Sequence, residues 1–358
     1  MTNLKAKAQA EAARLDKSYG LRTGSIGSQR FALNVVSTGS LALDYALGTG
    51  GWPRGHPIEV FGPPDIGKSS SIGLSAFRNS QANDNLCGLI ALEPGFDPDW
   101  AVKNGVDPEG LVVARPDDGE TAFEILAEWV NGDVIDTILF DSIGAVVSKS
   151  ELAQDELKSK VGGQSKLITD GIKRILIPCW KNDKLVILLN QVRDVIGSPV
   201  PGAKESPGGN ALKHHCAIRV QLKQSGRPIS EKIEGEDVVV ARTIVAQVKR
   251  NKLNEGTNQR AEFDYWQKAT EEHPIGIDAG KDIVSTAIRM RIINKAGAWF
   301  TSDLFPEGSK FQGRQSVEEF VLDNPDIADK VRIAVLAKMP TVQNIMPEVE
   351  EDGEARDS

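Results

Sequence analysis

The chain has 358 residues, 40% of them hydrophobic and 26% charged, and its 42 basic and 50 acidic residues give a formal net charge of −8. This length supports one large α/β core with smaller flanking domains, and the composition excludes wholesale disorder and a fibrous repeat. The acidic balance argues against nucleic-acid binding by the whole surface, although a local basic groove is compatible with it.

The first predicted element is a helix over residues 4–19 with a narrow apolar stripe, which ends near Gly20. From Ser37 onward, apolar strands alternate with helical patterns. Strands are expected at residues 57–61, 86–92, 134–140 and 185–189, and helices from Lys68 and over residues 121–131 and 164–182. This alternation predicts an α/β fold with a mostly parallel sheet that is covered on both faces.

Three more strand candidates follow with little helix between them, at residues 217–222, 238–247 and 260–266. We expect them to extend the sheet edge as antiparallel strands. Beyond about Gly276 the composition changes, and helical patterns around residues 295–300 predict a small α+β C-terminal domain over 276–340. Residues 341–358 hold six acidic residues against one arginine, which predicts an acidic disordered tail.

The chain shows no sign of a membrane or secretory segment. No stretch approaches the roughly 20 apolar residues that span a bilayer, and the first 15 residues lack a signal-peptide apolar run. Cys87, Cys179 and Cys216 are widely spaced in apolar contexts, so buried free thiols are favoured over a metal site or a disulfide. We therefore expect a cytoplasmic protein without a membrane partner.

One segment between a predicted strand and a predicted helix matches GxxxxGK[ST]. It consists of Gly62, Pro63, Pro64, Asp65, Ile66, Gly67, Lys68 and Ser69, and Ser70 follows it. Glycines let backbone N–H groups turn inward around a phosphate, and the helix N-terminus adds its positive dipole end. Lys68 can bridge the β- and γ-phosphates and the Ser69 hydroxyl can bind Mg²⁺. The Asp65 side chain is expected to point away from the phosphates.

Two carboxylates complete the predicted ATP and Mg²⁺ site. Asp141 ends the apolar run Ile138-Leu139-Phe140, the Walker B pattern, and would hold the magnesium through water. Glu93 ends the intervening strand and could polarise the water that attacks the γ-phosphate. Taken alone, Glu93 could equally be a surface carboxylate at a strand end. Together these motifs predict a P-loop ATPase.

Five strings in order extend this prediction, and they make the chain resemble the RecA family from about residue 13 to 339. They are Ser37-Thr38-Gly39-Ser40-Leu41, Ala46-Leu47-Gly48, Asn190-Gln191-Val192-Arg193, Gly208-Gly209-Asn210-Ala211-Leu212-Lys213 and Lys295-Ala296-Gly297-Ala298-Trp299. The resemblance implies a RecA-like P-loop core at 35–275, an N-terminal docking helix and linker at 1–34, a duplex-receiving C-terminal domain and an autoinhibitory tail.

For the ATP site, the resemblance makes Glu93 the catalytic glutamate and Gln191 the glutamine that senses the γ-phosphate. Asp97 and Trp100 fall at the adenine contacts, with Trp100 in place of the family's tyrosine. Arg250 and Lys252 match two lysines that reach the ATP of the neighbouring subunit, where they would stabilise transition-state charge. His214 departs from the family, which has a phenylalanine there that couples ATP to the subunit interface.

For DNA, the resemblance implies two binding loops, at about residues 154–163 and 192–210. The second is long and rich in glycine and proline, which is typical of a functional or mobile segment. Phosphate contacts are expected from side chains and backbone, and two apolar residues could wedge between bases. The phosphate candidates are Lys166, Lys173, Arg193, Gly208, Gly209 and Asn210, and the wedge candidates are Val161 and Ile196.

The leading interpretation is a DNA-dependent ATPase that forms helical filaments on single-stranded DNA and pairs it with homologous duplex DNA in recombination and repair. A ring-forming helicase motor shares the ATPase core, but would lack the N-terminal helix and the two strings that flank residues 192–210. A nucleotide-gated DNA coat without turnover is disfavoured by Glu93 and Asp141. A small-molecule kinase is disfavoured because no lid or acceptor site is evident.

Overall fold

The computed structural model of the chain describes residues 2–19, 33–153, 163–194, 204–205, 209–233, 235–254, 259–270 and 273–339. It separates into two units, Met1–Leu33 with Pro340–Ser358, and Asn34–Met339. In the first unit, helix α1 (Thr2–Tyr19) confirms the predicted N-terminal helix and begins two residues earlier. The predicted acidic tail at 341–358 lies outside the described residues.

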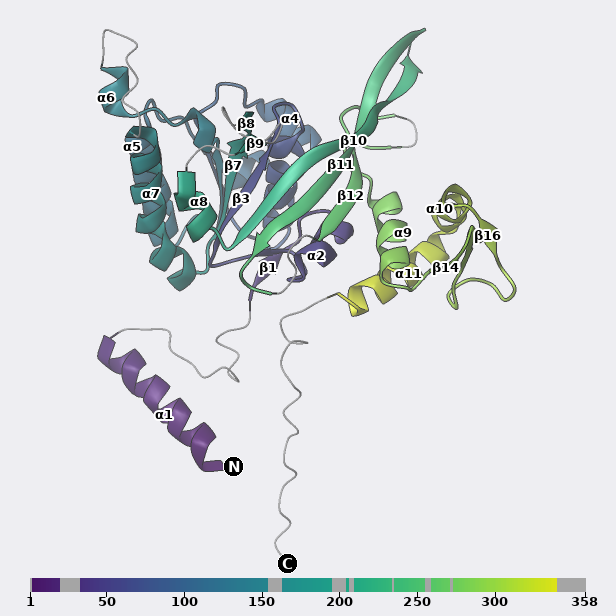
Figure 1. Ribbon diagram of the computed structural model, residues 1–358, viewed down its shortest axis with the longest axis horizontal. Coiled ribbons are helices and arrows are strands. Elements are labelled where there is room, and N and C mark those ends of the chain that lie inside the picture. The colour runs from purple at the N-terminus through teal and green to yellow at the C-terminus, as the bar shows by residue number, and fades with distance from the viewer. Residues whose placement is uncertain are drawn as a thin grey trace, which may run out of the picture. The chain divides into compact units, whose positions relative to one another are not determined.

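A nine-stranded sheet forms the centre of the second unit, in the order β13-β12-β11-β10-β3-β7-β6-β4-β5 (Figure 1). Its mutually parallel strands are β3 (Pro57–Gly62), β4 (Cys87–Ala91), β5 (Leu111–Ala114), β6 (Thr137–Asp141), β7 (Leu185–Gln191) and β10 (Ile218–Ile233). Antiparallel strands extend one side, namely β11 (Glu236–Asn251), β12 (Arg260–Trp266) and β13 (Gly276–Ile277). The predicted, mostly parallel α/β sheet is confirmed.

Helices cover both faces of this sheet. One face carries α2 (Leu41–Leu47), α3 (Ser75–Gln81) and α4 (Pro98–Lys103), and the other carries α5 (Gly119–Asn131), α7 (Gly163–Lys181) and α8 (Gly209–His215). Shorter elements are β1 (Val35–Val36), β2 (Trp52–Pro53), α6 (Lys149–Leu152), β8 (Arg193–Asp194) and β9 (Lys204–Glu205). Among the described helices, none is both long enough and apolar enough to cross a membrane.

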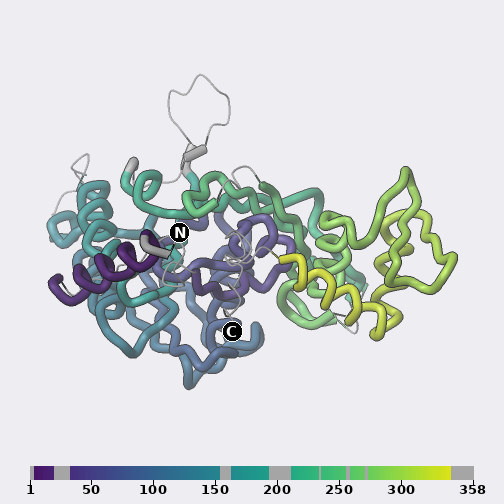
Figure 2. The backbone as a smooth tube through the Cα atoms, turned by 90° about the horizontal axis from the view of Figure 1, so that it is seen from below, coloured from purple at the N-terminus to yellow at the C-terminus, as the bar shows by residue number. Residues whose placement is uncertain are grey.

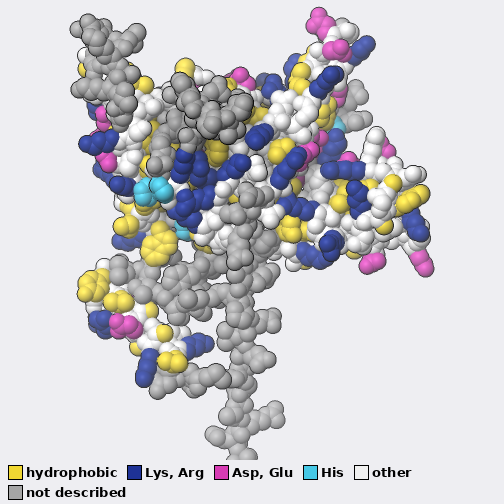
Figure 3. Space-filling model, in the orientation of Figure 1, with side chains coloured by type: hydrophobic (Ala, Val, Ile, Leu, Met, Phe, Trp, Pro, Cys, Tyr) yellow, Lys and Arg dark blue, Asp and Glu magenta, His cyan; other side chains and the backbone are white. Residues whose placement is uncertain are grey.

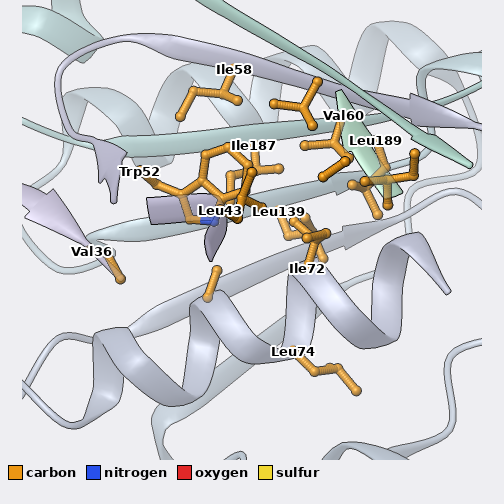
Figure 4. Packing of buried hydrophobic residues seen from close by; sticks show 14 of the residues in the cluster. Val36, Leu43, Trp52, Ile58, Val60, Ile72, Leu74, Leu139, Ile187 and Leu189 are labelled. Atoms are coloured by element: carbon orange, nitrogen blue, oxygen red, sulfur yellow. The ribbon is translucent and has the colours of Figure 1, made fainter. Parts of the chain in front are cut away.

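Strand β7 shows why the core has two halves. Alternate residues of a strand face opposite sides of a sheet. Leu185, Ile187 and Leu189 therefore join the cluster on the α2 and α3 side, and Val186 and Leu188 join the cluster on the α5 and α7 side. The continuous apolar run at residues 185–189 is typical of a parallel sheet buried on both faces. Figure 4 shows Ile187 and Leu189 packed with residues of the first cluster.

The sequence prediction for the sheet edge is partly wrong. Strand β10 pairs in parallel with β3, and only β11 to β13 continue in antiparallel fashion. The reason is that α8 lies between β7 and β10, and a helical crossover returns the chain in the same direction. Strands β10 and β11 are also much longer than predicted, 16 residues each, and their far ends pair only with each other as a hairpin that projects beyond the sheet (Figure 1).

The chain after β13 builds a second, smaller cluster. Its elements are α9 (Ala279–Arg289), β14 (Asn294–Ala296), β15 (Trp299–Thr301), β16 (Phe311–Gln312), α10 (Arg314–Asp323) and α11 (Pro325–Ala337). They bury their own apolar cluster around Val284, Phe300 and Val331, and lie beside the β12 end of the sheet (Figure 2). The buried Asp282 of α9 accepts hydrogen bonds from Ser40 Oγ (2.9 Å) and the backbone N–H of Leu41 (2.5 Å), which joins α9 to the N-terminus of α2.

Candidate functional site

The segment Gly62–Ser69 forms a tight turn after β3 and leads into a π-helical segment, Lys68–Leu74, that continues as α3. Two glycines allow this path. Gly67 has a φ of +86°, and a Cβ at Gly62 would lie 2.8 Å from the carbonyl oxygen of Leu222. Pro64 and Asp65 are exposed in the turn. A strand, a glycine turn and a helix N-terminus in this order form a ready cradle for an anion.

Lys68 lies buried inside this turn. Its Nζ donates hydrogen bonds to the carbonyl oxygens of Pro63 (2.7 Å) and Gly62 (3.3 Å). Burial is the main reason that the pKa of Lys68 lies below its usual range, and the charges of Asp141 and Glu93 act in the opposite direction. Phosphate oxygens would give this ammonium group full negative charges in place of carbonyl dipoles.

Ser69 and Asp141 contact each other directly, with Ser69 Oγ donating to Asp141 Oδ2 at 2.6 Å. Burial raises the pKa of Asp141, and the hydrogen bond from Ser69 opposes this effect. A hydroxyl and a single carboxylate suit Mg²⁺, which takes its other ligands from phosphates and water. Within the described ranges, no group of three or more His, Cys, Asp or Glu side chains could hold a metal by itself. The residues therefore fit Mg²⁺ bound together with a nucleotide.

Glu93 reaches the same edge of the sheet from the end of β4. Ala91 pairs with Asp141 in the register of β4 and β6, and the backbone N–H of Leu92 donates to Asp141 O at 2.7 Å. The Glu93 carboxylate oxygen Oε1 accepts hydrogen bonds from Gln191 Nε2 (2.9 Å) and from Ser142 Oγ. Carboxyl ends of neighbouring parallel strands thus bring these predicted residues together, as expected for α/β sheets.

The two residues predicted to contact adenine line one small cavity beside the turn. This cavity has a volume of about 150 Å³, and its walls include Ser69, Ser70, Asp97 and Trp100. Trp100 Nε1 donates to Ser70 Oγ at 3.0 Å, so the indole is anchored to the phosphate turn. Asp97 caps α4 by accepting a hydrogen bond from the backbone N–H of Asp99 (2.9 Å).

Arg250 and Lys252 lie at the end of the parallel strands that is opposite to the phosphate turn. Ile218 of β10 pairs with both Ile58 and Asn251, so the end of β11 lies level with the start of β3, one strand away across β10, whereas the phosphate turn follows the end of β3. Arg250 Nη1 donates to the carbonyl of Lys213 and Lys252 Nζ to that of His214, both in the last turn of α8. The two cations are therefore separated from the phosphate turn of their own chain.

Positive charge gathers around the end of α8. Burial, followed by the charges of Lys173, Lys252 and His214, lowers the pKa of His215. Figure 3 shows Lys and Arg side chains beside histidines on this part of the surface. Lys166 and Lys173 are exposed on α7 and are seven residues apart, which places them on one face of that helix.

The other predicted DNA contacts are described only in part. The backbone of Arg193 lies in β8 and that of Gly209 and Asn210 in the first turn of α8. Three candidates lie outside the described residues, namely Val161, Ile196 and Gly208.

Two residues that contact the site were not predicted from the sequence. Ser142 donates a hydrogen bond to Glu93, and its only signal in the sequence is that it follows Asp141. Tyr265, from β12, donates to Asn104 Oδ1 at 2.8 Å, and burial raises its pKa to about 12.

As predicted, the thiols of Cys87, Cys179 and Cys216 are buried and free.

The sheet, the phosphate turn and the paired carboxylates define a protein of the P-loop nucleotide-binding class. Comparison with protein families is more specific. The RecA N-terminal domain matches residues 7–268, and the RecA C-terminal domain matches residues 281–340. The chain belongs to the RecA family, and it is accordingly a recombinase that binds ATP and DNA.

Curated relatives resemble the chain over nearly its whole length. Protein RecA of Rhodopirellula baltica is 33% identical over 345 residues, which cover 95% of this chain and 87% of the relative. Protein RecA of Acidiphilium cryptum is 33% identical over 352 residues, 97% of this chain and 98% of the relative. Protein RecA of Leptospira biflexa is 34% identical over 322 residues, 88% of this chain and 79% of the relative.

Proposed function

We propose that the chain is a DNA-dependent ATPase that assembles into helical filaments on single-stranded DNA and couples ATP hydrolysis to homologous pairing and strand exchange. The observation that carries this proposal is the position of Arg250 and Lys252. They lie level with the start of β3, one strand away across β10, and the phosphate turn follows the end of β3. A site that needs these cations requires a second copy, and repeated head-to-tail contacts of this kind generate a closed ring or an open helical filament. Membership of the RecA family favours the filament.

The geometry supports the following roles within one site. Lys68 and the turn N–H groups would bind the phosphates, and Ser69 and Asp141 would hold Mg²⁺, which would neutralise charge at the phosphate oxygens. Glu93 takes the proton of the attacking water. Gln191 contacts Glu93 and directly precedes the 192–210 segment, so it is placed to link the nucleotide to DNA.

DNA binding is proposed for the basic residues of α7 and α8 and for the two loops. The positive charges of Lys166 and Lys173 would attract the phosphate backbone of DNA. Arg193 lies where the second loop begins, and Gly209 and Asn210 lie where it ends. Contacts of this kind to the backbone do not read sequence, which suits a protein that pairs any two homologous strands.

A cytoplasmic location stays a prediction.

A joint-molecule assay tests the proposal. A labelled single-stranded oligonucleotide is incubated with the protein, ATP, Mg²⁺ and supercoiled duplex DNA. We expect joint molecules with a homologous duplex and none with a heterologous one. If no joint molecules form and the protein unwinds a forked duplex in a separate assay, the result would instead support the ring-helicase alternative. If the protein coats DNA but does not hydrolyse ATP, the result would support the nucleotide-gated coat.

A further inference from the structure

A buried ion pair lies in the middle of the sheet, outside the nucleotide site. Glu59 of β3 is 0% exposed, and its Oε2 accepts a hydrogen bond from Arg219 Nε of β10 at 2.5 Å. The guanidinium of Arg219 also lies over the ring of Phe61, 4.8 Å from its centroid. Burying two charges is costly even when they are paired, so an apolar pair would hold the strands together at least as well.

The same carboxylate is connected to the catalytic edge of the sheet. Asn190 Nδ2 donates to Glu59 Oε1 at 2.9 Å, and Asn190 Oδ1 accepts the backbone N–H of Gln191 at 3.0 Å. Gln191 Nε2 then donates to Glu93 Oε1 at 2.9 Å. An unbroken chain of hydrogen bonds therefore runs from Glu59 to Glu93.

The ion pair is connected to the opposite edge as well. Arg219 pairs with Glu59 across β10 and β3, and with Arg250 across β10 and β11. Residues directly opposite on antiparallel strands project from the same face of a sheet. Arg219 thus lies between Glu59 and the residue that the proposed function assigns to the ATP of the neighbouring subunit.

We propose that Glu59 is a positioning residue. It holds Gln191, and through it Glu93, in a fixed position relative to the strand that carries Arg250. This inference rests on the proposed function and deepens it. A fully satisfied buried network is rigid, so displacement of Gln191 by a bound nucleotide is passed to β10 and β11. The nucleotide bound by one subunit then affects the position of Arg250 and Lys252, the cations that the same subunit places at the ATP of its neighbour.

The test uses the full chain with two variants and one control. Glu59→Gln keeps the size of the side chain and an acceptor for Asn190 but removes the charge that pairs with Arg219. Asn190→Ala keeps both charges of the ion pair and removes the side chain that links Glu59 to Gln191. The control is Asp44→Asn, which alters a buried carboxylate bonded to Ser37 Oγ (2.7 Å) and to the backbone N–H of Thr38 (2.8 Å), away from this network.

Steady-state ATP hydrolysis is measured on single-stranded DNA, together with the ratio of DNA affinities in a slowly hydrolysed ATP analogue and in ADP. Circular dichroism checks folding. We expect each variant to lower kcat at least about tenfold while KM for ATP changes less than about threefold, because the phosphate turn is untouched. The affinity ratio should fall toward one, and the control should stay within about twofold of wild type in both measurements.

The two levels of the proposal fail separately. If wild type itself shows no DNA-stimulated hydrolysis, the proposed function is wrong. If wild type is stimulated and the folded variants keep kcat and the affinity ratio within about twofold, Glu59 only stabilises the sheet and the inference is wrong. If Glu59→Gln does not fold, Asn190→Ala decides. If neither variant folds, the network only stabilises the fold and the inference is wrong.

Discussion

Gln191 Nε2 lies 2.9 Å from Glu93 Oε1, although 98 positions separate the two residues in the chain. Glu93 follows β4 and Gln191 is the last residue of β7, and β6 lies between these strands and ends in Asp141. The bond therefore joins the two strands on either side of the strand that carries the predicted magnesium ligand. Any group bound between Lys68 and Asp141 would be sensed by a side chain that immediately precedes the proposed DNA loop.

Lys68→Ala should abolish ATP turnover. The buried ammonium group is the cation placed inside the phosphate turn, and alanine cannot replace its charge. We expect kcat on single-stranded DNA to fall by roughly 10³-fold, measured by phosphate release. Lys103→Ala, which removes an exposed lysine of α4, is the control and should have no effect. Undiminished DNA-stimulated turnover in Lys68→Ala would rule out the phosphate-site assignment.

Glu93→Gln should separate ATP binding from hydrolysis. Glutamine keeps an acceptor for Ser142 but cannot take a proton from water. Binding of a fluorescent ATP analogue and assembly on DNA should be retained, while turnover falls at least about 10²-fold. Glu109→Gln, at an exposed glutamate, serves as the control. Turnover close to wild type would assign the base to another residue.

The trans arrangement can be tested by mixing two inactive variants. Arg250→Ala/Lys252→Ala keeps an intact phosphate turn, and Glu93→Gln keeps the trans cations. In a mixed head-to-tail filament some interfaces combine both intact halves, so an equimolar mixture should recover roughly a quarter of wild-type hydrolysis. Hydrolysis no greater than the sum of the separate variants would contradict a shared site.

Stability should depend on pH through Asp282. Burial raises its pKa from the usual 3.8 to about 7, so between about pH 4 and 7 the folded state binds more protons than the unfolded state. Its contribution therefore stabilises the fold as pH falls from 7 toward 4, and is lost as pH rises through 7. Asp44, with a pKa of about 6, acts in the same direction.

Denaturant unfolding at pH 5, 6, 7 and 8 measures this effect. Relative to wild type, Asp282→Asn should reduce the loss of unfolding free energy between pH 5 and 7 by about 1 kcal/mol per pH unit, and should change it little between pH 7 and 8. Asp323→Asn, at an exposed carboxylate, should leave the slope unchanged. Equal slopes in wild type and Asp282→Asn would mean that Asp282 does not titrate in this range.

The sequence predicted the sheet well where each strand is a continuous apolar run, as in residues 185–189. It placed the start of β10 correctly but ended the strand too early, because Gly226 and Pro228 resemble the end of a strand. The register shifts between Ser225 and Ile229 show that the hairpin accommodates both through an irregularity and continues.

The site was predictable to the extent that its residues are adjacent in a motif, as Lys68 and Ser69 are. Glu59 gave no signal, since one glutamate between apolar residues resembles a solvent-facing position. Its partner Arg219 is 160 positions away, and the two meet only because β10 lies next to β3. Contacts of that kind follow from strand order, which no local pattern encodes.

We expect ATP hydrolysis to require assembly on DNA, because the proposed trans cations and the phosphate turn lie at opposite ends of the parallel strands of one subunit. The most direct measurement is ATP hydrolysis with and without single-stranded DNA, with electron micrographs taken of the same mixtures. We predict slow hydrolysis without DNA, strong stimulation by DNA, and helical filaments where hydrolysis is stimulated. Equal hydrolysis in both mixtures, by particles that form no filaments, would contradict the account.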